Sequence, residues 1–187
     1  DGMAANKLLV NVALVRPQIG WNTGNVGRTC LAFGATLHVI APAFGLDERS
    51  VRRAGLDYWK DVDVHTYESW EAYDAATRAS IPRRFFFSTK GSQGLEETTF
   101  LRKGDLTEPE EASGAPALPS VPTALVFGSE TAGLFELIGS EAMEGHEVVR
   151  IPMLDTTRSL NLSTTAGMVL WEYWRQYLHS GGRGSPP

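Results

Sequence analysis

The sequence predicts an α/β fold in which helices flank a parallel β-sheet. Near-continuous apolar runs, such as residues 8–15, are typical of strands that are covered on both faces. Segments with helical spacing of apolar residues alternate with these runs, as in strand–helix–strand units. The 187 residues, 42% of them hydrophobic and 21% charged, suit one domain with a sizeable core. We therefore predict a single domain over residues 8–178.

The predicted elements follow one another in regular order. After the first strand, a helix begins with Asn22 or Thr23 as its N-cap and ends at Gly34. The remaining strands are predicted at residues 36–41, 62–66, 84–88, 123–127 and 147–151. Further helices are predicted at residues 47–60, 69–79, 134–140 and, starting at 161 or 163, up to 178.

The last helix has a wide apolar stripe. Met168 and Trp171 extend this stripe beyond what one face of a sheet requires. Packing within the domain and a second buried surface, such as a dimer contact, both remain open. The stripe consists of Ala166, Val169, Leu170, Tyr173, Trp174 and Tyr177.

Three segments depart from the strand and helix pattern. Residues 1–7, with Asp1-Gly2 ahead of Met3, are expected to be a disordered expression scar. Residues 105–122, rich in proline and acids, are predicted to form a disordered or extended insertion within the domain. Residues 179–187 are expected to be a flexible tail.

Composition narrows the class of protein. The net charge of -5 argues against non-specific coating of nucleic acid, which requires many basic residues. The single cysteine, Cys30, excludes an intrachain disulfide and fits a reducing compartment. No apolar run is long enough to span a membrane, and no signal peptide is evident. We expect a cytoplasmic protein, with an organellar matrix or stroma as the alternative.

Basic residues gather locally despite the negative net charge. One group lies at Arg49, Arg52, Arg53 and Lys60, and a second at Arg83, Arg84 and Lys90. An RNA-facing patch and an ordinary solvated surface are both compatible with this pattern.

Several familiar chemistries lack their motifs. The four histidines are scattered, so we predict no metal site. Neither a phosphate-binding P-loop nor the Gly-x-Gly-x-x-Gly motif of dinucleotide-binding folds is present. Ser129 follows a strand, but Gly-x-Ser-x-Gly, the motif of a serine nucleophile, is absent.

Three loops rich in glycine or hydroxyl residues each follow a buried strand, at residues 89–94, 128–133 and 152–163. If these strands are neighbours, the loops converge at one edge of the sheet and can surround a small molecule. The helix face that carries Asn25 and Arg28 could stand opposite. Taken alone, the third loop also fits a plain connection to a capped helix.

Four motifs occur in this order along the chain. They are Asn22-Thr23-Gly24-Asn25-Val26-Gly27-Arg28, Arg53-Ala54-Gly55-Leu56-Asp57-Tyr58, Phe127-Gly128-Ser129-Glu130-Thr131-Ala132-Gly133-Leu134, and Ile151-Pro152-Met153 with Ser159-Leu160-Asn161-Leu162-Ser163. Together they resemble the SpoU-type branch of the SPOUT RNA methyltransferases, over residues 8–178. Within this family the chain is most similar to the small tRNA (cytidine/uridine-34) 2′-O-methyltransferases.

The resemblance implies a fold, a cofactor and an assembly. The fold is a parallel sheet with a C-terminal trefoil knot, a rare exception to un-knotted topology. The cofactor is S-adenosylmethionine and the assembly is a homodimer. By position, the resemblance implies cofactor contacts at Phe87, Gly128, Glu130, Ile151, Met153, Ser159 and Leu160.

The resemblance also implies roles in catalysis and RNA binding. Arg28 corresponds to the catalytic arginine and Asn25 to its motif partner, while Arg52, Arg53 and Tyr58 match an RNA-facing or interfacial segment. A guanidinium with a pKa above about 12 gives up its proton reluctantly, so we expect charge stabilisation rather than general-base catalysis from Arg28.

The implied activity is methyl transfer to the ribose 2′-hydroxyl of tRNA nucleotide 34. No separate RNA-binding domain is expected before the first predicted strand, and this favours tRNA over rRNA. Methylation of rRNA or another tRNA position, and a non-catalytic RNA-binding module, are the alternatives. The sequence leaves open whether cytidine or uridine is used, and what residues 105–122 contact.

Overall fold

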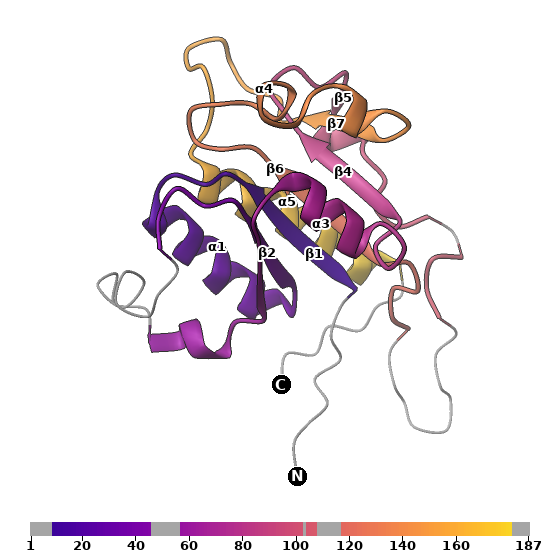
Figure 1. The fold of residues 1–187 in the computed structure, drawn as a ribbon. Helices are drawn as coiled ribbons and strands as arrows, with labels where there is room; N and C mark the ends of the chain where they lie inside the picture. Colours follow the sequence, from indigo (N-terminus) through magenta and orange to yellow (C-terminus); the bar gives the residue numbers. More distant parts are fainter. Residues whose placement is uncertain (1–8, 46–56, 103, 108–116, 181–187) are drawn as a thin grey trace.

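The computed structural model describes residues 9–45, 57–102, 104–107 and 117–180. In this part of the chain, seven strands form one parallel sheet in the order β3-β2-β1-β6-β4-β7-β5 (Figure 1). The strands are β1 (Val10–Val15), β2 (Thr36–Ile40), β3 (Val64–Tyr67), β4 (Arg83–Phe87), β5 (Gln93–Gly94), β6 (Thr123–Phe127) and β7 (Glu147–Arg150). The predicted α/β class with a parallel sheet is confirmed.

Helices cover both faces of the sheet. They are α1 (Gly20–Phe33), α3 (Trp70–Thr77), α4 (Leu134–Ile138) and α5 (Leu162–His179), with 3-10 turns η1 (Asp57–Asp61), η2 (Leu95–Glu97) and η3 (Glu141–Met143). Strand β1 shows how the layers form: Val10, Val12 and Leu14 join one core and Ala13 and Val15 the other, because side chains alternate along a strand.

The two cores differ in their partners. The first is completed by α1 and α5, which supply Val26, Cys30 and Tyr173 among others. The second is completed by Tyr73 of α3 and Leu134 of α4. The apolar stripe of α5 therefore packs mainly within the domain, while Trp171 and Met168 stay 52% and 41% exposed.

Helix α1 begins earlier than the sequence suggested. Its N-cap is Ile19, which has no capping side chain, and not Asn22 or Thr23. Asn22 is buried in the first turn of the helix, where its amide bonds to distant residues. The C-cap was predicted correctly: Gly34 has a φ of 65°, a left-handed conformation that glycine adopts without strain.

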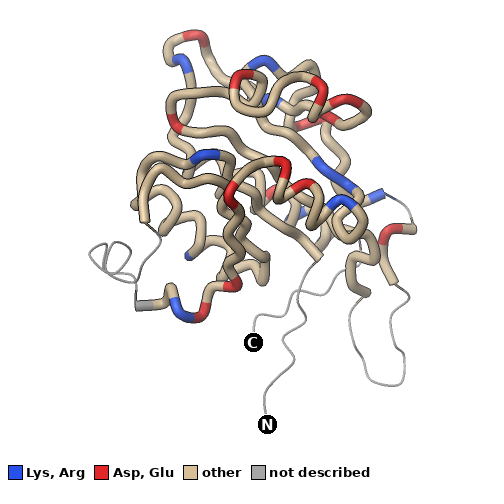
Figure 2. The backbone as a smooth tube through the Cα atoms, viewed as in Figure 1, with Lys and Arg blue, Asp and Glu red and all other residues tan. Residues whose placement is uncertain are grey.

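Two of the basic residues assigned to a possible RNA-facing patch are ion-paired inside the fold. Arg83 pairs with Asp105, and Arg84, whose side chain is 4% exposed, pairs with Asp74. Both guanidiniums are held by a carboxylate, so neither of the two open interpretations, an RNA-facing patch or an ordinary solvated surface, describes Arg83 and Arg84. In Figure 2, Lys and Arg are interspersed with Asp and Glu along the described part of the chain.

The pair with Asp105 also fixes the start of the proline-rich segment. The Asp105 carboxylate accepts a further bond from the Arg102 backbone, and Leu106 forms an antiparallel bridge with Pro119. Residues 108–116, between these packed ends, lie outside the described residues, as do residues 1–8, 46–56, 103 and 181–187.

Candidate functional site

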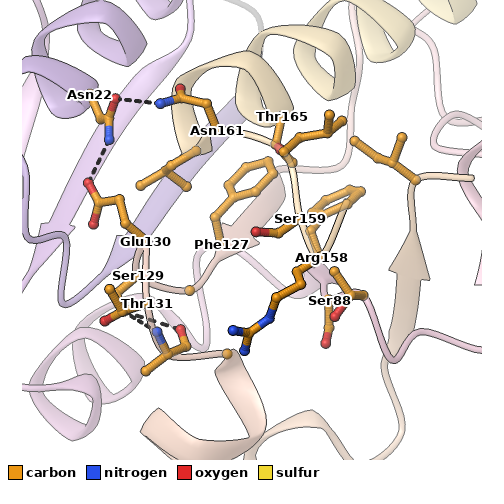
Figure 3. Close-up of a pocket in the computed structure, with 18 of the residues that line it drawn as sticks. Asn22, Ser88, Phe127, Ser129, Glu130, Thr131, Arg158, Ser159, Asn161 and Thr165 are labelled. Carbon is orange, nitrogen blue, oxygen red and sulfur yellow. Dashed lines mark hydrogen bonds between the residues drawn. The ribbon is translucent and has the colours of Figure 1, made fainter. Parts of the chain in front are cut away.

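A cavity of about 650 Å³ opens at the carboxyl ends of β6, β4 and β7. Its walls come mainly from the segments that follow these three adjacent strands, joined by the starts of α1 and α5 (Figure 3). The three loops expected to converge therefore do so. This edge of an open parallel sheet is the usual position of a ligand site, and the volume suits a small molecule.

Close backbone packing holds the loops in place. A Cβ at Gly91 would lie 2.6 Å from the Val149 carbonyl carbon, so the loop after β4 can approach β7 only with glycine there. A Cβ at Gly128 would lie 2.9 Å from the Ala132 oxygen, so glycine also permits the turn after β6. The Ser129 hydroxyl accepts a bond of 2.9 Å from the Ala132 backbone. Ser129 thus stabilises a turn.

The cavity has an apolar floor and a polar rim. The rings of Phe87 and Phe127 stack with centroids 4.8 Å apart. They are joined in the cavity wall by aliphatic residues such as Val149 and Leu162. Hydroxyl groups line the remainder: Ser88, Thr89, Ser129, Thr131, Ser159 and Thr165. Such a wall suits a ligand with both a flat apolar part and polar groups.

Glu130 connects the loop after β6 to the start of α1. Its carboxylate accepts bonds from the backbone of Gln18 (2.8 Å) and Ile19 (3.1 Å) and from the Asn22 side chain (2.9 Å). These are charge-assisted bonds to donors at a helix N-terminus, where a negative charge is favoured. They attach the residues just ahead of α1, and Asn22 in its first turn, to the loop after β6.

The same network continues to α5. The Asn22 amide oxygen accepts a bond of 3.0 Å from Asn161 (Figure 3). Asn161 in turn caps α5, because its side-chain oxygen accepts bonds from Ser163 and Thr164. Glu130, Asn22 and Asn161 thus form a chain of contacts that joins three elements around the cavity.

Arg158 is the only basic residue among the described residues that line the cavity. Its side chain points toward the cavity interior in Figure 3. Neither an ion pair nor a hydrogen bond engages its guanidinium within the described part of the chain. The carboxylate of Glu130, the acidic lining residue, is already bonded to the start of α1. The Arg158 guanidinium is therefore the charged group of the cavity lining that can contact a ligand.

The seven residues that the resemblance assigned to the cofactor all line this one cavity. They are Phe87, Gly128, Glu130, Ile151, Met153, Ser159 and Leu160. Their contact with a cofactor stays a prediction. The geometry adds that the Glu130 oxygens are spent on the protein's own donors.

The residues assigned to catalysis and RNA binding are placed differently. Asn25 and Arg28 lie on the exposed face of α1 and are not among the residues that line the cavity. The Arg28 guanidinium lies 4.7 Å from the centroid of the Tyr58 ring, and the Tyr58 hydroxyl donates to the Gly24 carbonyl. Arg52 and Arg53 lie outside the described residues.

Sequence reasoning missed three polar residues of the site: Asn22, Asn161 and Arg158. Asn22 and Asn161 were considered as helix caps and as members of the family motifs, and Arg158 lies in the loop at residues 152–163 without an assigned role. A polar side chain on the buried face of an otherwise amphipathic helix was the available signal for Asn22.

The model of the SpoU rRNA Methylase family matches residues 9–171, which is most of the chain. The chain belongs to this family. The family predicted from the four motifs is thereby confirmed.

Among SpoU relatives, the tRNA (cytidine(34)-2'-O)-methyltransferase of Burkholderia cenocepacia (strain HI2424) is 41% identical over 176 residues, which cover 93% of this chain and 99% of the relative. The enzyme of the same name from Saccharophagus degradans is 36% identical and is covered in full.

Solved structures agree with this assignment. A protein whose structure is described as "Structural insights into the 2-OH methylation of C/U34 on tRNA" is 34% identical, with a TM-score of 0.72 over 91% of this chain and 97% of its own. The SpoU methyltransferase AviRb from Streptomyces viridochromogenes, solved in complex with the cofactor AdoMet, shares the fold with a TM-score of 0.66 at 24% identity, over 90% of this chain and 60% of its own. The helices in the described part of the chain lack the length and the apolar character that a membrane span requires.

Proposed function

We propose that this protein is an S-adenosylmethionine-dependent tRNA methyltransferase that modifies the ribose 2′-hydroxyl of the wobble nucleotide 34, a cytidine or a uridine. The observation that carries the proposal is the cavity at the carboxyl edge of the sheet, which is lined by every residue that the family motifs assign to the cofactor. Relatives that share 36–41% identity over nearly the whole chain bear the name of this activity.

The cavity fits the chemistry of the cofactor. Stacked Phe87 and Phe127, with Ile151 and Leu160, offer a flat apolar surface for an adenine ring. Ser159 and the exposed backbone of the loops at residues 128–133 and 151–160 offer donors and acceptors for ribose and amino-acid groups. When bound, S-adenosylmethionine supplies an electrophilic methyl group on a sulfonium sulfur.

The task of the protein is to align the hydroxyl and to stabilise charge. The 2′-hydroxyl oxygen would give up its proton to solvent and carry negative charge as it approaches the methyl carbon, and this charge would disappear once the new bond is complete. Arg28 supplies a permanent positive charge for this oxygen or for the adjoining phosphate. The stacking contact with Tyr58 limits the orientations available to its guanidinium. The Glu130, Asn22 and Asn161 network positions the start of α1, and with it Arg28, relative to the cavity.

The proposed functional form is a cytoplasmic homodimer. Trp171 and Met168 on α5 and Leu31 on α1 are large apolar side chains that remain exposed in the single chain. A second copy packed on α1 and α5 would cover them. The proposal includes a C-terminal trefoil knot, formed where the segment between β7 and α5 passes the loops after β4 and β6.

The proposal is tested by incubating the protein with radiolabelled S-adenosylmethionine and separate tRNA and rRNA pools, followed by mapping of the modified nucleotide. We expect 2′-O-methylation at tRNA position 34, and the mapped base identifies cytidine or uridine as the substrate. Methylation confined to rRNA or to another tRNA position would contradict the assignment. If calorimetry detects no binding of the cofactor, only the alternative of a non-catalytic RNA-binding module would remain.

A further inference from the structure

Trp21 is exposed beside the cavity without a structural role of its own. It lies in the first turn of α1, between Ile19 and Asn22, which both line the cavity. It is 60% exposed, and Ile19 beside it is 46% exposed. In the described part of the chain, neither an aromatic ring nor a cation packs against the Trp21 indole.

The other four tryptophans of the chain each have a packing partner. Trp59 fills the space over Gly27, where a Cβ would lie 2.6 Å from its ring. Trp70 contacts the rings of Tyr73 and Phe86, and both Trp171 and Trp174 contact Phe33. Only Trp21 leaves most of its surface in solvent without such a contact, so the domain's own packing does not explain it.

Helix geometry places Trp21 in line with the predicted catalytic residues. Trp21, Asn25 and Arg28 are four and three residues apart, so they share one face of α1 to within about 60°. All three are exposed, whereas Val26 and Cys30 on the opposite face are buried. One stripe on the surface therefore carries an indole ring, an amide and a guanidinium, and its first member lies at the edge of the cavity.

We propose that Trp21 is the platform on which the base of nucleotide 34 stacks while its ribose enters the cavity. This inference rests on the proposed function. A protein that modifies a nucleotide in a single-stranded loop must replace the stacking that the base loses when it is splayed out, and aromatic side chains supply this contact.

The two neighbours on the stripe favour RNA over a protein partner. An amide can bond to a base edge and a guanidinium to a phosphate, so Asn25 and Arg28 complete the contacts that one nucleotide offers. A second copy of the chain seated on this stripe would instead have to bury Asn25 and Arg28, which offer it no apolar contact. Stacking on an indole ring also accommodates either cytosine or uracil, because every base has a π-face.

The test measures binding of an unmodified anticodon stem-loop RNA to the full-length protein by fluorescence anisotropy. We expect Trp21→Ala to raise the dissociation constant about ten-fold, within the range that one base-stacking contact contributes. Trp21→Phe should retain most of the affinity, whereas Trp21→Leu, which is apolar but has no ring, should behave like Trp21→Ala. Calorimetry should give the same affinity for S-adenosylmethionine in all variants.

A second RNA, which has a ribose but no base at position 34, identifies the partner of the ring. The dissociation constant of wild type for this abasic stem-loop should equal that of Trp21→Ala for the unmodified stem-loop. With the abasic stem-loop, Trp21→Ala should not weaken binding any further. The proposal would be overturned if the losses of RNA affinity from Trp21→Ala and from removal of the base were additive. It would also be overturned if Trp21→Ala were coupled only to a base at another position. A change of oligomeric state in Trp21→Ala on gel filtration would also overturn it, because Trp21 would then be an interface residue.

Two comparisons separate this inference from its premise. Leu9→Ala, an exposed apolar substitution at the amino end of β1, is the matched control and should leave RNA binding unchanged. Wild type alone decides the proposed function, through methylation of nucleotide 34. Active wild type with an unaffected Trp21→Ala would refute only the role of Trp21.

Discussion

Glutamine in place of Glu130 should weaken the connection between the loop after β6 and the start of α1. The carboxylate accepts bonds from two backbone groups and one amide, and two of these donors, Ile19 and Asn22, lie at the start of the helix. Glutamine keeps the size of the side chain and one oxygen. That oxygen can still accept from Ile19 and Asn22, but the new amide nitrogen then faces the backbone N–H of Gln18, which donates as well.

The expected loss follows from these contacts. One charge-assisted bond is removed, and because the bonds to the backbone are exposed we take the lower part of the usual range, about 1–2 kcal/mol. For a domain of this size that corresponds to a decrease in melting temperature of roughly 2–8 °C. The cofactor affinity should fall too, since the loop that carries Gly128 and Glu130 lines the cavity.

The assay combines urea unfolding, thermal melting and calorimetry with S-adenosylmethionine. Glu136→Gln is the matched control, because this substitution changes the net charge by the same amount at an exposed acid on α4. Asn22→Ala should cost less in the Glu130→Gln background than in wild type, because the two side chains share a bond. Stability and cofactor affinity equal to those of Glu136→Gln would refute the proposed role of Glu130.

Four further predictions address other parts of the molecule. Arg28→Ala should abolish methyl transfer and leave cofactor binding nearly intact; lost cofactor affinity in calorimetry would contradict this division of roles. Arg52→Ala/Arg53→Ala should reduce the salt dependence of tRNA binding, and an unchanged slope would count against their contact with phosphates. The wild-type protein should elute with about twice the 20.4 kDa chain mass, and Trp171→Glu should shift it toward the monomer; a wild-type monomer would exclude the dimer. Because its bond to Arg83 lowers the pKa of Asp105, the stability gained from this carboxylate is complete well above its ordinary pKa of about 3.9 and is lost as the pH falls through the lowered value. The difference in unfolding free energy between wild type and Asp105→Asn should therefore shrink at low pH, and a pH-independent difference would argue against this ion pair.

Local patterns in the sequence predicted the elements well where the cause is local. Strand β6 was predicted with both ends correct, because all five of its residues are buried and the run ends at Gly128. The C-cap at Gly34 follows from the conformation that glycine alone adopts freely. Strand β5 was read as part of a turn, because two residues carry no pattern and only pairing with β7 makes them a strand.

The sequence predicted many of the residues that line the candidate site, but not all of their arrangement in space. The motifs identified the loops and seven residues that line the cavity, although the sequence alone left the adjacency of β6, β4 and β7 as a condition. Asn25 and Arg28 lie on the exposed face of α1 and do not line the cavity, and their position relative to a bound substrate stays a prediction.

By itself, the sequence determined the α/β class, the family and the residues around the cavity, because periodicity and short motifs are properties of neighbouring residues. The tertiary structure decided which polar groups are available. Asn22 and Glu130 are 108 residues apart, and their bond, rather than a local cap, stabilises the start of α1. Arg83 is likewise taken up by Asp105, while Trp21 and Arg158 remain available. Such pairings depend on which distant segments the fold brings together, and local propensity carries no information about them.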